Sequence, residues 1–156
     1  MSKSLKRVRA ALEEAGETVE VMEMAGSTRT AAEAAAAADC NVDQIAKSII
    51  FRGLDDGHVT LFLTAGGNRV DPLKAAAVAG QELGKADADL IRRETGFAIG
   101  GVAPVGHLRP VVAFFDPRLS DFDIVWAAAG TPRHIFAIAP SRLLAITGAT
   151  VADFTG

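Results

Sequence analysis

Cysteine and histidine are both scarce in this sequence. Cys40 is the single cysteine among 156 residues, which excludes a disulfide within the chain. The three histidines, His58, His107 and His134, lie far apart from one another and from Cys40, and no zinc-binding spacing is present. We therefore expect no metal and no organic cofactor. Cys40 follows an alanine run, and we interpret it as a small core residue.

A long apolar run and a basic excess are missing as well. No apolar run reaches the roughly 18 residues of a membrane-spanning helix, and the charged N-terminal segment lacks the apolar core of a signal peptide. The formal net charge is −3, whereas a protein that wraps around duplex nucleic acid usually carries a basic excess. These absences predict a cytoplasmic protein without a DNA or membrane partner. A small basic patch that binds one end of an RNA stays possible.

The remaining composition is typical of one globular domain. Hydrophobic residues make up 49% of the chain and charged residues 22%. A domain of this length buries roughly 70% of the surface that its unfolded chain exposes, which is enough for a sizeable core. No internal repeat or linker divides the sequence, so we expect residues 1–156 to form a single domain.

Helical spacing and capping residues predict five helices. Leu5, Val8 and Leu12 recur at helical spacing ahead of Gly16. Thr30 and the glutamate three residues later form a capping box before an alanine run that is expected to end near Asn41. The other three helices are expected to begin at Asp71, at Asp87 or Asp89, and at Ser141, and to end at Gly80, Gly96 and Gly148.

Six segments have the composition of β-strands, namely residues 18–24, 44–53, 58–67, 111–116, 123–130 and 133–139. The second and third form a predicted hairpin with Asp56 and Gly57 in its turn. Both are apolar at nearly every position, which favours a sheet covered on both faces. Helices and strands follow one another without a regular βαβ alternation. We therefore predict an α+β (mixed α/β) domain with a mixed sheet of about six to seven strands flanked by helices.

Lys47 is the first candidate for a functional residue. On an extended strand it shares one face with the apolar residues Ile45, Ile49 and Phe51. One interpretation is a long side chain that covers apolar surface and keeps its ammonium in water. The other is an ammonium at the mouth of a cleft, suited to a phosphate or a polarised carbonyl.

The second candidate is the glycine-rich stretch GFAIGGVAPVGH, residues 96–107. It has neither the spacing of a dinucleotide fingerprint nor the Gly-Lys-Ser/Thr of a P-loop. One interpretation is a tight turn that closes a hairpin, with φ fixed at Pro104. The other is a bend whose backbone N–H groups bind an anion or stabilise an oxyanion.

The third candidate is GTPRH, residues 130–134, between two predicted strands. His134 could act as a general acid or base, or it could be an exposed turn residue; the same two interpretations apply to His107. Nucleophilic catalysis finds little support, because the chain has no Gly-x-Ser-x-Gly elbow and Cys40 has no evident base. An enzyme with this sequence would work by positioning and backbone electrostatics.

Taken together, these motifs resemble the YbaK/EbsC family of free-standing aminoacyl-tRNA deacylases, over nearly the whole chain. The resemblance rests on the capping box before the alanine helix, QIAKSIIF (44–51), GGNRVD (66–71), TGFAIGGVAPVGH (95–107) and AGTPRHIFAIAPSRLLAITGA (129–149). It implies the fold of the editing domain inserted in bacterial prolyl-tRNA synthetases. It also implies hydrolysis of the ester that joins a wrong small amino acid, such as alanine or cysteine, to tRNA for proline.

The resemblance also assigns roles to residues. It implies Lys47 near the tRNA acceptor end, Gly100 and Gly101 in a loop that holds the scissile carbonyl, and a hydroxyl of the terminal adenosine that helps to activate water. The implied catalytic residues are Lys47, Gly100 and Gly101. The expected substrate-binding residues are Val102, Ala103, Pro104, Gly130, His134, Ile49 and Thr64, with Phe51 as a further possible wall of the pocket.

The expected partners are the acceptor end of an aminoacyl-tRNA and a synthetase that could recruit the protein. Because the chain is acidic, RNA contact would depend on local basic groups: Lys3, Lys6, Arg7 and Arg9, or Arg92 and Arg93, or Arg133 and Arg142. The main alternative is a non-catalytic module of the same fold that binds an aminoacyl or nucleotide ligand. A third possibility is a hydrolase for another small acyl ester.

Overall fold

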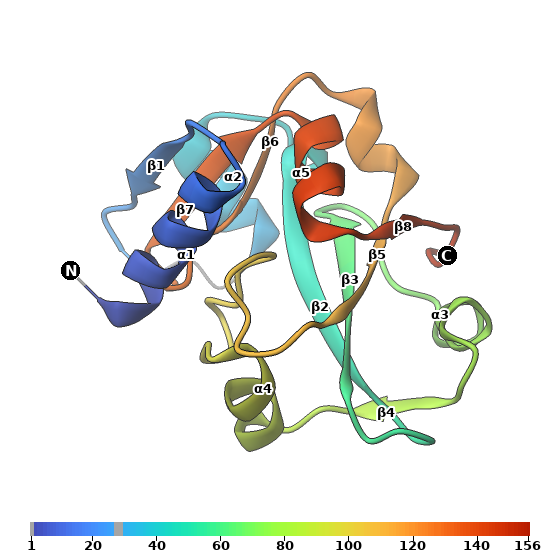
Figure 1. Cartoon of the computed structure of the whole chain (residues 1–156). Helices are drawn as coiled ribbons and strands as arrows, with labels where there is room; N and C mark the ends of the chain where they lie inside the picture. Colours follow the sequence, from blue (N-terminus) through green and yellow to red (C-terminus); the bar gives the residue numbers. More distant parts are fainter. Residues whose placement is uncertain (1, 27–29) are drawn as a thin grey trace.

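The computed structural model describes residues 2–26 and 30–156, which form five α-helices, two 3₁₀ helices and one sheet of eight strands (Figure 1). The α-helices are α1 (Lys3–Glu14), α2 (Ala31–Ala38), α3 (Pro72–Ala79), α4 (Ala88–Thr95) and α5 (Pro140–Thr147), and the 3₁₀ helices are η1 (Val42–Gln44) and η2 (Pro117–Asp121). The strands are β1 (Glu20–Glu23), β2 (Ile45–Gly53), β3 (Val59–Ala65), β4 (Leu83–Lys85), β5 (Val112–Phe115), β6 (Val125–Ala128), β7 (His134–Ile138) and β8 (Thr150–Val151). None of the described helices is long and apolar enough to cross a membrane.

The predicted mixed α/β sheet is confirmed, with two short strands that sequence reasoning missed. The strand order is β1-β7-β6-β2-β3-β5-β8, and β4 pairs with β2 beside this path. β2 and β3 form the predicted antiparallel hairpin, whereas β6 pairs parallel to β2 and β5 parallel to β3. The missed strands, β4 and β8, have three and two residues, too few to show an alternating pattern.

One edge of β2 is unpaired in its middle. β3 occupies one edge of β2 along most of its length. On the other edge, β6 pairs only with residues 45–46 and β4 only with residues 51–53. Figure 1 shows β6 and β4 at opposite ends of β2. Residues 47–50 therefore border a gap in the sheet among the described strands.

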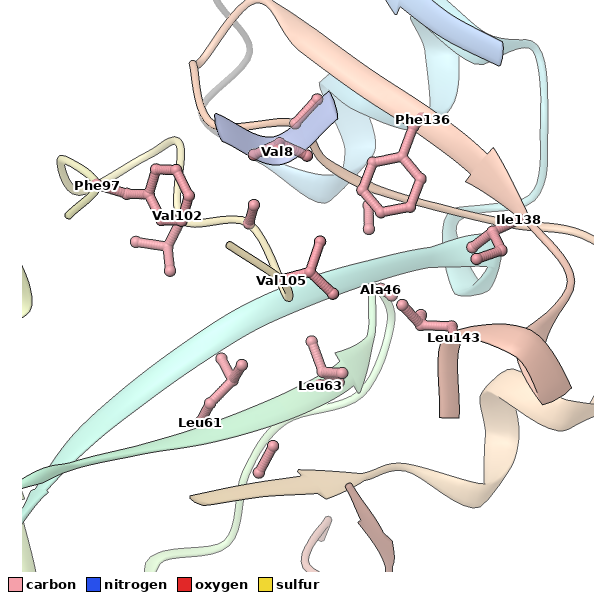
Figure 2. Close-up of a cluster of buried hydrophobic side chains, with 14 of the residues drawn as sticks. Val8, Ala46, Leu61, Leu63, Phe97, Val102, Val105, Phe136, Ile138 and Leu143 are labelled. Carbon is pink, nitrogen blue, oxygen red and sulfur yellow. The ribbon is translucent and has the colours of Figure 1, made fainter. Parts of the chain in front are cut away.

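The two faces of the sheet carry separate apolar clusters. Because side chains alternate along a strand, Ala46 and Ile50 of β2 pack into the main core with α1, α4, α5 and the glycine-rich stretch (Figure 2). Ile49 and Phe51 project to the other face, where they pack in a cluster around Phe62. Figure 2 labels Val102 and Val105 of the glycine-rich stretch beside Leu61 and Leu63 of β3. The stretch therefore packs on the same face as Ala46.

The helix predictions hold except at one start. Asp71 caps α3 as expected, with its carboxylate accepting from the amides of Leu73 and Lys74. The expectation that Ser141 caps the last helix is wrong. Ala139 is the N-cap residue of α5 and makes no side-chain cap, and Pro140 stands in the first turn with Ser141 already helical. Proline is favoured at this position because its fixed φ suits a helix start and its missing N–H needs no partner there.

Cys40 follows α2 and is half-buried beside a small cluster of Ala34, Ala35 and Ile45. Cys40 thus packs at the margin of this cluster and is not the fully buried core residue expected from the sequence. Burial, with the nearby charge of Asp39, raises the pKa of its thiol, which disfavours the reactive thiolate.

Candidate functional site

A cleft of about 520 Å³ lies at the gap in the sheet. Its floor is the unpaired edge of β2, residues 47–50. Because the gap opens through the sheet, both faces contribute walls. The lining from α2 and the neighbouring sheet face consists of Ala31, Ala34, Ile45, Trp126 and Ile135. The lining from the opposite face includes Ile91, Ile99, Gly100, Val102, Thr131 and Pro132.

The bend of the glycine-rich stretch depends on two glycines for different reasons. Gly100 has φ +94°, a conformation that side chains rarely adopt. At Gly101, a Cβ would lie 2.8 Å from the Cα of Thr131, so only glycine lets the two backbones approach. The stretch connects α4 to β5, which pairs parallel to β3. The interpretation as a turn that closes a hairpin is therefore wrong.

The backbone amides of this bend are only partly engaged. The Gly101 amide donates to the Ala98 carbonyl at 3.1 Å. For the amides of Gly100 and Val102 we find no hydrogen bond within residues 2–26 and 30–156. Both residues line the cleft, and Val102 is 7% exposed. The bend thus leaves two N–H groups without a partner among the described residues, in residues that line the cleft.

Lys47 borders the cleft from the other face of the sheet. Its Nζ donates to the Gly66 carbonyl at 3.2 Å. Burial, followed by the charge of Arg69, lowers the pKa of Lys47, against the opposing effect of Asp43 and Asp116. Its side chain shares a face with Ile49, whereas the glycine bend packs on the opposite face. Lys47 and the glycine bend therefore lie on opposite faces of the sheet and both border the cleft at the gap. They do not face each other across a cavity on one face of the sheet.

A second hollow, of about 690 Å³, continues from Lys47 along its own face of the sheet. Its lining includes Lys47, Arg69, Asp71, Phe51 and the exposed Leu73. Arg69 is exposed, and its guanidinium makes no hydrogen bond or ion pair within the described part of the chain. Among the lining side chains, two are cations and one, Asp71, is a carboxylate, and one oxygen of that carboxylate already accepts from the α3 amides.

His134 opens β7 and lines the cleft. Its Nδ1 lies 2.6 Å from the Thr131 hydroxyl, its Nε2 lies 3.9 Å from a Glu23 carboxylate oxygen, and its side chain is 18% exposed. The interpretation of His134 as an exposed turn residue is therefore wrong.

His107 lies behind the bend, where its Nε2 is 2.7 Å from the Ala103 carbonyl. Burial, together with the charge of Arg7, lowers the pKa of His107 although the Ala103 contact opposes this shift. Arg7 also braces this region, because its Nε donates to the Gly106 carbonyl at 2.8 Å and its guanidinium lies over the Phe97 ring. His107 and Arg7 thus hold the bend in place and do not line the cleft.

The structure brings together some of the sequence candidates and separates others. Lys47, Ile49, Gly100, Val102 and His134 line the cleft. The residues outside its lining are Thr64, Gly101, Ala103, Pro104 and Gly130. Phe51 lines the second hollow instead.

Each residue outside the cleft lining has a packing role. Thr64 is fully buried and donates its hydroxyl to the Phe62 carbonyl. Ala103 is fully buried in the main core, and Pro104 lines a separate surface hollow. A Cβ at Gly130 would lie 2.8 Å from the Ser4 carbonyl oxygen, which places this glycine against α1.

Ser48 and Trp126 are among the cleft residues that were not predicted from sequence, whereas Thr131 lies within the candidate stretch 130–134. Ser48 is a polar residue in an otherwise apolar strand and directly follows Lys47, a signal that sequence reasoning could have used. Trp126 carries no comparable local signal, since only the sheet pairing brings it to β2. No group of three or more metal-ligating side chains occurs within the described residues.

The cleft thus combines apolar walls, unpaired backbone N–H groups, two lysines (Lys47 and Lys85) and the imidazole of His134. Free amides next to an apolar pocket suit a small acyl group whose carbonyl oxygen becomes negative. Residues 25–146 match the family described as the aminoacyl-tRNA editing domain.

Similar proteins cover nearly the whole chain. A crystal structure of a protein proposed to be a trans-editing enzyme for prolyl-tRNA synthetase is 48% identical, covers 100% of this chain and 99% of its own, and superposes with a TM-score of 0.93. The structure of the hypothetical protein APE2540 is 29% identical over 96% of this chain and 99% of its own, with a TM-score of 0.87. The uncharacterised protein YwhH of Bacillus subtilis (strain 168) is 30% identical over 140 residues, which cover 90% of this chain and 88% of that protein.

Proposed function

The chain belongs to the aminoacyl-tRNA editing domain family, and we propose that it hydrolyses the ester bond of mischarged aminoacyl-tRNA in trans. The observation that carries this proposal is the cleft itself. There the unbonded amides of Gly100 and Val102, the ammonium of Lys47 and the imidazole of His134 border one small apolar space. A small acyl group fits the apolar walls, and its carbonyl can accept from the bend.

The reaction needs only modest help, because an aminoacyl ester is already activated. Water attacks the carbonyl carbon, negative charge develops on the carbonyl oxygen, and the ester C–O bond breaks. The ribose oxygen leaves and takes up a proton, which yields a free amino acid and tRNA. In this proposal the amides of Gly100 and Val102 stabilise the oxyanion, and removal of one such donor typically costs about 3–4 kcal/mol of transition-state stabilisation. A hydroxyl of the terminal adenosine would orient the attacking water.

Lys47 holds the acceptor end in this proposal. Its ammonium lies between the cleft and the second hollow, where Arg69 supplies another cation. A phosphate of the terminal nucleotides can therefore bind beside the cleft while the acyl group enters it. Phosphate contacts of this kind position a nucleic acid without reading its sequence.

We expect tRNA for proline that carries a small amino acid, such as alanine or cysteine, as the substrate. The similar protein proposed to act with prolyl-tRNA synthetase supports this choice. Such an enzyme is useful because one methylene in an apolar pocket gives a synthetase only about 1–3 kcal/mol of discrimination. A second, smaller pocket can remove the resulting errors.

We assign the whole chain, residues 1–156, to this editing domain, although the family match covers residues 25–146. Leu5, Val8 and Leu12 of α1 belong to the main core cluster. Phe154 is fully buried against Phe62. Both ends of the chain thus complete the packing of the matched region.

The test uses purified protein and a panel of mischarged tRNAs. We expect release of one or a few small amino acids, and at least a tenfold loss of kcat/KM in Lys47→Ala. Arg52→Ala is the matched control, because Arg52 is an exposed cation of the same strand outside both hollows. A wild-type protein that binds aminoacyl-tRNA but hydrolyses no ester in the panel would instead indicate the non-catalytic binding module.

A further inference from the structure

The turn that follows β3, residues 66–68, holds the ammonium of Lys47. Lys47 Nζ donates to the Gly66 carbonyl at 3.2 Å, and the two residues lie close because Thr64, just before the turn, is the ladder partner of Lys47. An ammonium has three N–H donors, so a ligand can accept from at most two others. The position of the turn therefore decides where these donors lie beside the cleft and the second hollow.

The 3₁₀ helix η1 packs directly against this turn. A Cβ at Gly66 would overlap the Val42 carbonyl oxygen, and a Cβ at Gly67 would overlap Asp43 Oδ1. Glycine lets the two segments approach because it has no Cβ. The Gly67 amide consequently reaches the Asp43 carboxylate and donates to Oδ1 at 2.8 Å.

A second carboxylate, that of Asp116, ties the two ends of the turn together. Its Oδ2 accepts from the Ala65 amide at 3.0 Å and from Asn68 Nδ2 at 2.9 Å. Asp116 is nearly fully buried. Bonds to a buried carboxylate are costly to break, because its oxygens would be left unpaired away from water. The turn is thus held by one carboxylate at its ends and by Asp43 in its middle.

Arg118 joins the two carboxylates. Its backbone amide donates to Asp116 Oδ1 at 2.9 Å, and its Nε donates to Asp43 Oδ2 at 3.0 Å. Its Nη1 also donates to Asp121 at 2.9 Å, and the Asp121 side chain is 57% exposed. Asp43, Asp116 and Arg118 therefore form one network around the turn, with Asp121 at the margin of this network.

We propose that Asp43 is a positioning residue for Lys47, because it fixes the turn whose carbonyl holds the Lys47 ammonium. The inference rests on the proposed function, in which Lys47 holds the acceptor end. Asp43 lines neither the cleft nor the second hollow, so it acts through the turn and does not touch the substrate. Asp43 is the residue to vary because its side chain is 20% exposed, whereas the loss of the buried Asp116 would affect folding.

The kinetic test is a double-mutant cycle on the mischarged tRNA that the wild-type protein hydrolyses fastest. We expect Asp43→Ala to lower kcat/KM about fivefold or more in the wild-type background and less than about twofold in Lys47→Ala. A residue that acts through Lys47 has nothing left to position once Lys47 is removed. Asp43→Asn keeps an oxygen that can accept from the Gly67 amide, so its kcat/KM should stay within about threefold of wild type.

Gly67→Ala tests the same bond from the side of the turn. The new Cβ would displace the Asp43 carboxylate from the Gly67 amide, and the end of the Asp43 side chain can move away without a shift of the backbone. We expect a loss of kcat/KM similar to that in Asp43→Ala, again absent in Lys47→Ala. This variant keeps the inference testable if Asp43→Ala folds poorly.

Asp121→Asn is the matched control. It removes the other carboxylate that pairs with the Arg118 side chain. Within the described residues we find no hydrogen bond between Asp121 and the turn. Because exposed ion pairs contribute little, kcat/KM should stay within about twofold of wild type.

An NMR titration of the Lys47 side chain tests the coupling without a substrate. Burial, followed by the charge of Arg69, lowers the pKa of Lys47, whereas the charges of Asp43 and Asp116 oppose this shift. Asp43→Asn removes one of the opposing charges, so the Lys47 midpoint should move to lower pH. Asp121→Asn should leave the midpoint unchanged.

The possible failures are distinguishable. An equal loss from Asp43→Ala in the wild-type and Lys47→Ala backgrounds would overturn the inference, because Asp43 would then act independently of Lys47. A loss in Asp43→Asn as large as in Asp43→Ala would also overturn it, since the charge and not the bond to the turn would then matter. A Lys47 midpoint that Asp43→Asn leaves unchanged would overturn the inference alone. Failure of the wild-type protein to hydrolyse any ester of the panel would overturn the proposed function itself.

Discussion

At the scale of single residues, two glycines determine the backbone conformation and the packing of the glycine bend. Gly100 needs its positive φ, and Gly101 needs the absence of a side chain, because the Thr131 backbone lies against it. The same contact positions Thr131 near His134. A change at Gly101 is therefore expected to disturb both walls of the cleft.

We predict that Gly101→Ala lowers the free energy of unfolding by about 1–3 kcal/mol, because the new Cβ would overlap backbone atoms of Thr131 that cannot move away cheaply. Denaturant unfolding measures this change. Gly26→Ala is the matched control, since a Cβ at Gly26 meets nothing within 4 Å. Equal stability of the two variants would show that the bend does not pack against Thr131 as described.

Lys47 is held in a setting that disfavours its charge. Burial, with the charge of Arg69, lowers the pKa of Lys47. Because the folded protein binds this proton less tightly than the unfolded chain does, the free energy of unfolding rises with pH. The full gain is present above the ordinary lysine pKa of about 10.4, and it is lost as the pH falls through the lowered pKa of Lys47 in the folded protein. Near neutral pH the charged Lys47 ammonium therefore lowers the free energy of unfolding, and a bound phosphate would reduce this loss.

We predict that the Lys47 ammonium titrates below the pH at which ordinary lysines titrate, and that Arg69→Met moves the midpoint upward, because one nearby positive charge is removed. NMR detection of the Lys47 side chain across alkaline pH measures both midpoints. Arg52→Met should leave the midpoint where it is. A Lys47 midpoint at the ordinary lysine value would contradict the burial described for it.

At the scale of elements, helix starts depend on short-range bonds. Asp71 accepts from two amides in the first turn of α3, whereas Ser141 lies inside α5 and caps nothing. α3 and the segment before it carry Arg69 and Leu73, which border the second hollow beside Lys47. The cap therefore helps to hold one side of the region that we assign to the acceptor end.

We predict that Asp71→Ala costs about 1 kcal/mol of stability through loss of this cap. Ser141→Ala should change stability by less than about 0.5 kcal/mol. Thermal or denaturant unfolding of the two variants under identical conditions tests the pair. A larger loss of stability in Ser141→Ala than in Asp71→Ala would contradict the assignment of Asp71 as a helix cap and of Ser141 as a residue that caps no helix.

The gap in the sheet is also a property of elements. β2 has nine residues, but β6 and β4 together cover only the two ends of its free edge. An uncovered edge usually invites pairing with another chain. Here α2, α4 and the glycine bend contribute residues on both sides of it, so the edge becomes the floor of a cleft.

At the scale of the whole molecule, the net charge of −3 limits how the protein can bind tRNA. Several predicted basic groups are already engaged within the protein. Arg7 supports the bend, and Arg142 pairs with Glu17. Arg69 and Lys47 stand at the hollow beside the cleft. We therefore expect few phosphate contacts and a shallow dependence of binding on salt.

We predict a slope of about −1.4 for log affinity against log salt, from two contacts on a single-stranded acceptor end, and a slope about 0.7 shallower in Arg69→Ala. Binding of a non-hydrolysable aminoacyl-tRNA analogue at several salt concentrations measures the slopes. Arg52→Ala should keep the wild-type slope. A steep wild-type slope, or one that Arg69→Ala leaves unchanged, would place the phosphate contacts elsewhere on the surface.

Much of the architecture followed from the sequence because the responsible interactions are local. Asp71 and Gly80 mark a helix through bonds within one turn. Two apolar runs, residues 44–53 and 58–67, mark a hairpin because the turn residues Asp56 and Gly57 lie between them. The resemblance to a known family likewise pointed to Lys47 and to the bend. These signals do not require knowledge of the rest of the chain.

Other features depended on contacts between residues far apart in the sequence, and only the tertiary structure decided them. The short pairing of β6 and β4 with β2 leaves the gap in the sheet. The packing of residues 96–107 puts the bend on the face opposite Lys47. The Ser48 hydroxyl is buried there without a hydrogen-bond partner in the part of the chain that the structure describes. A hydroxyl in an apolar strand looks the same in a sequence whether a neighbour pairs it or not. Its partners are set by the ordering of strands, which depends on long-range burial and pairing rather than on local propensity.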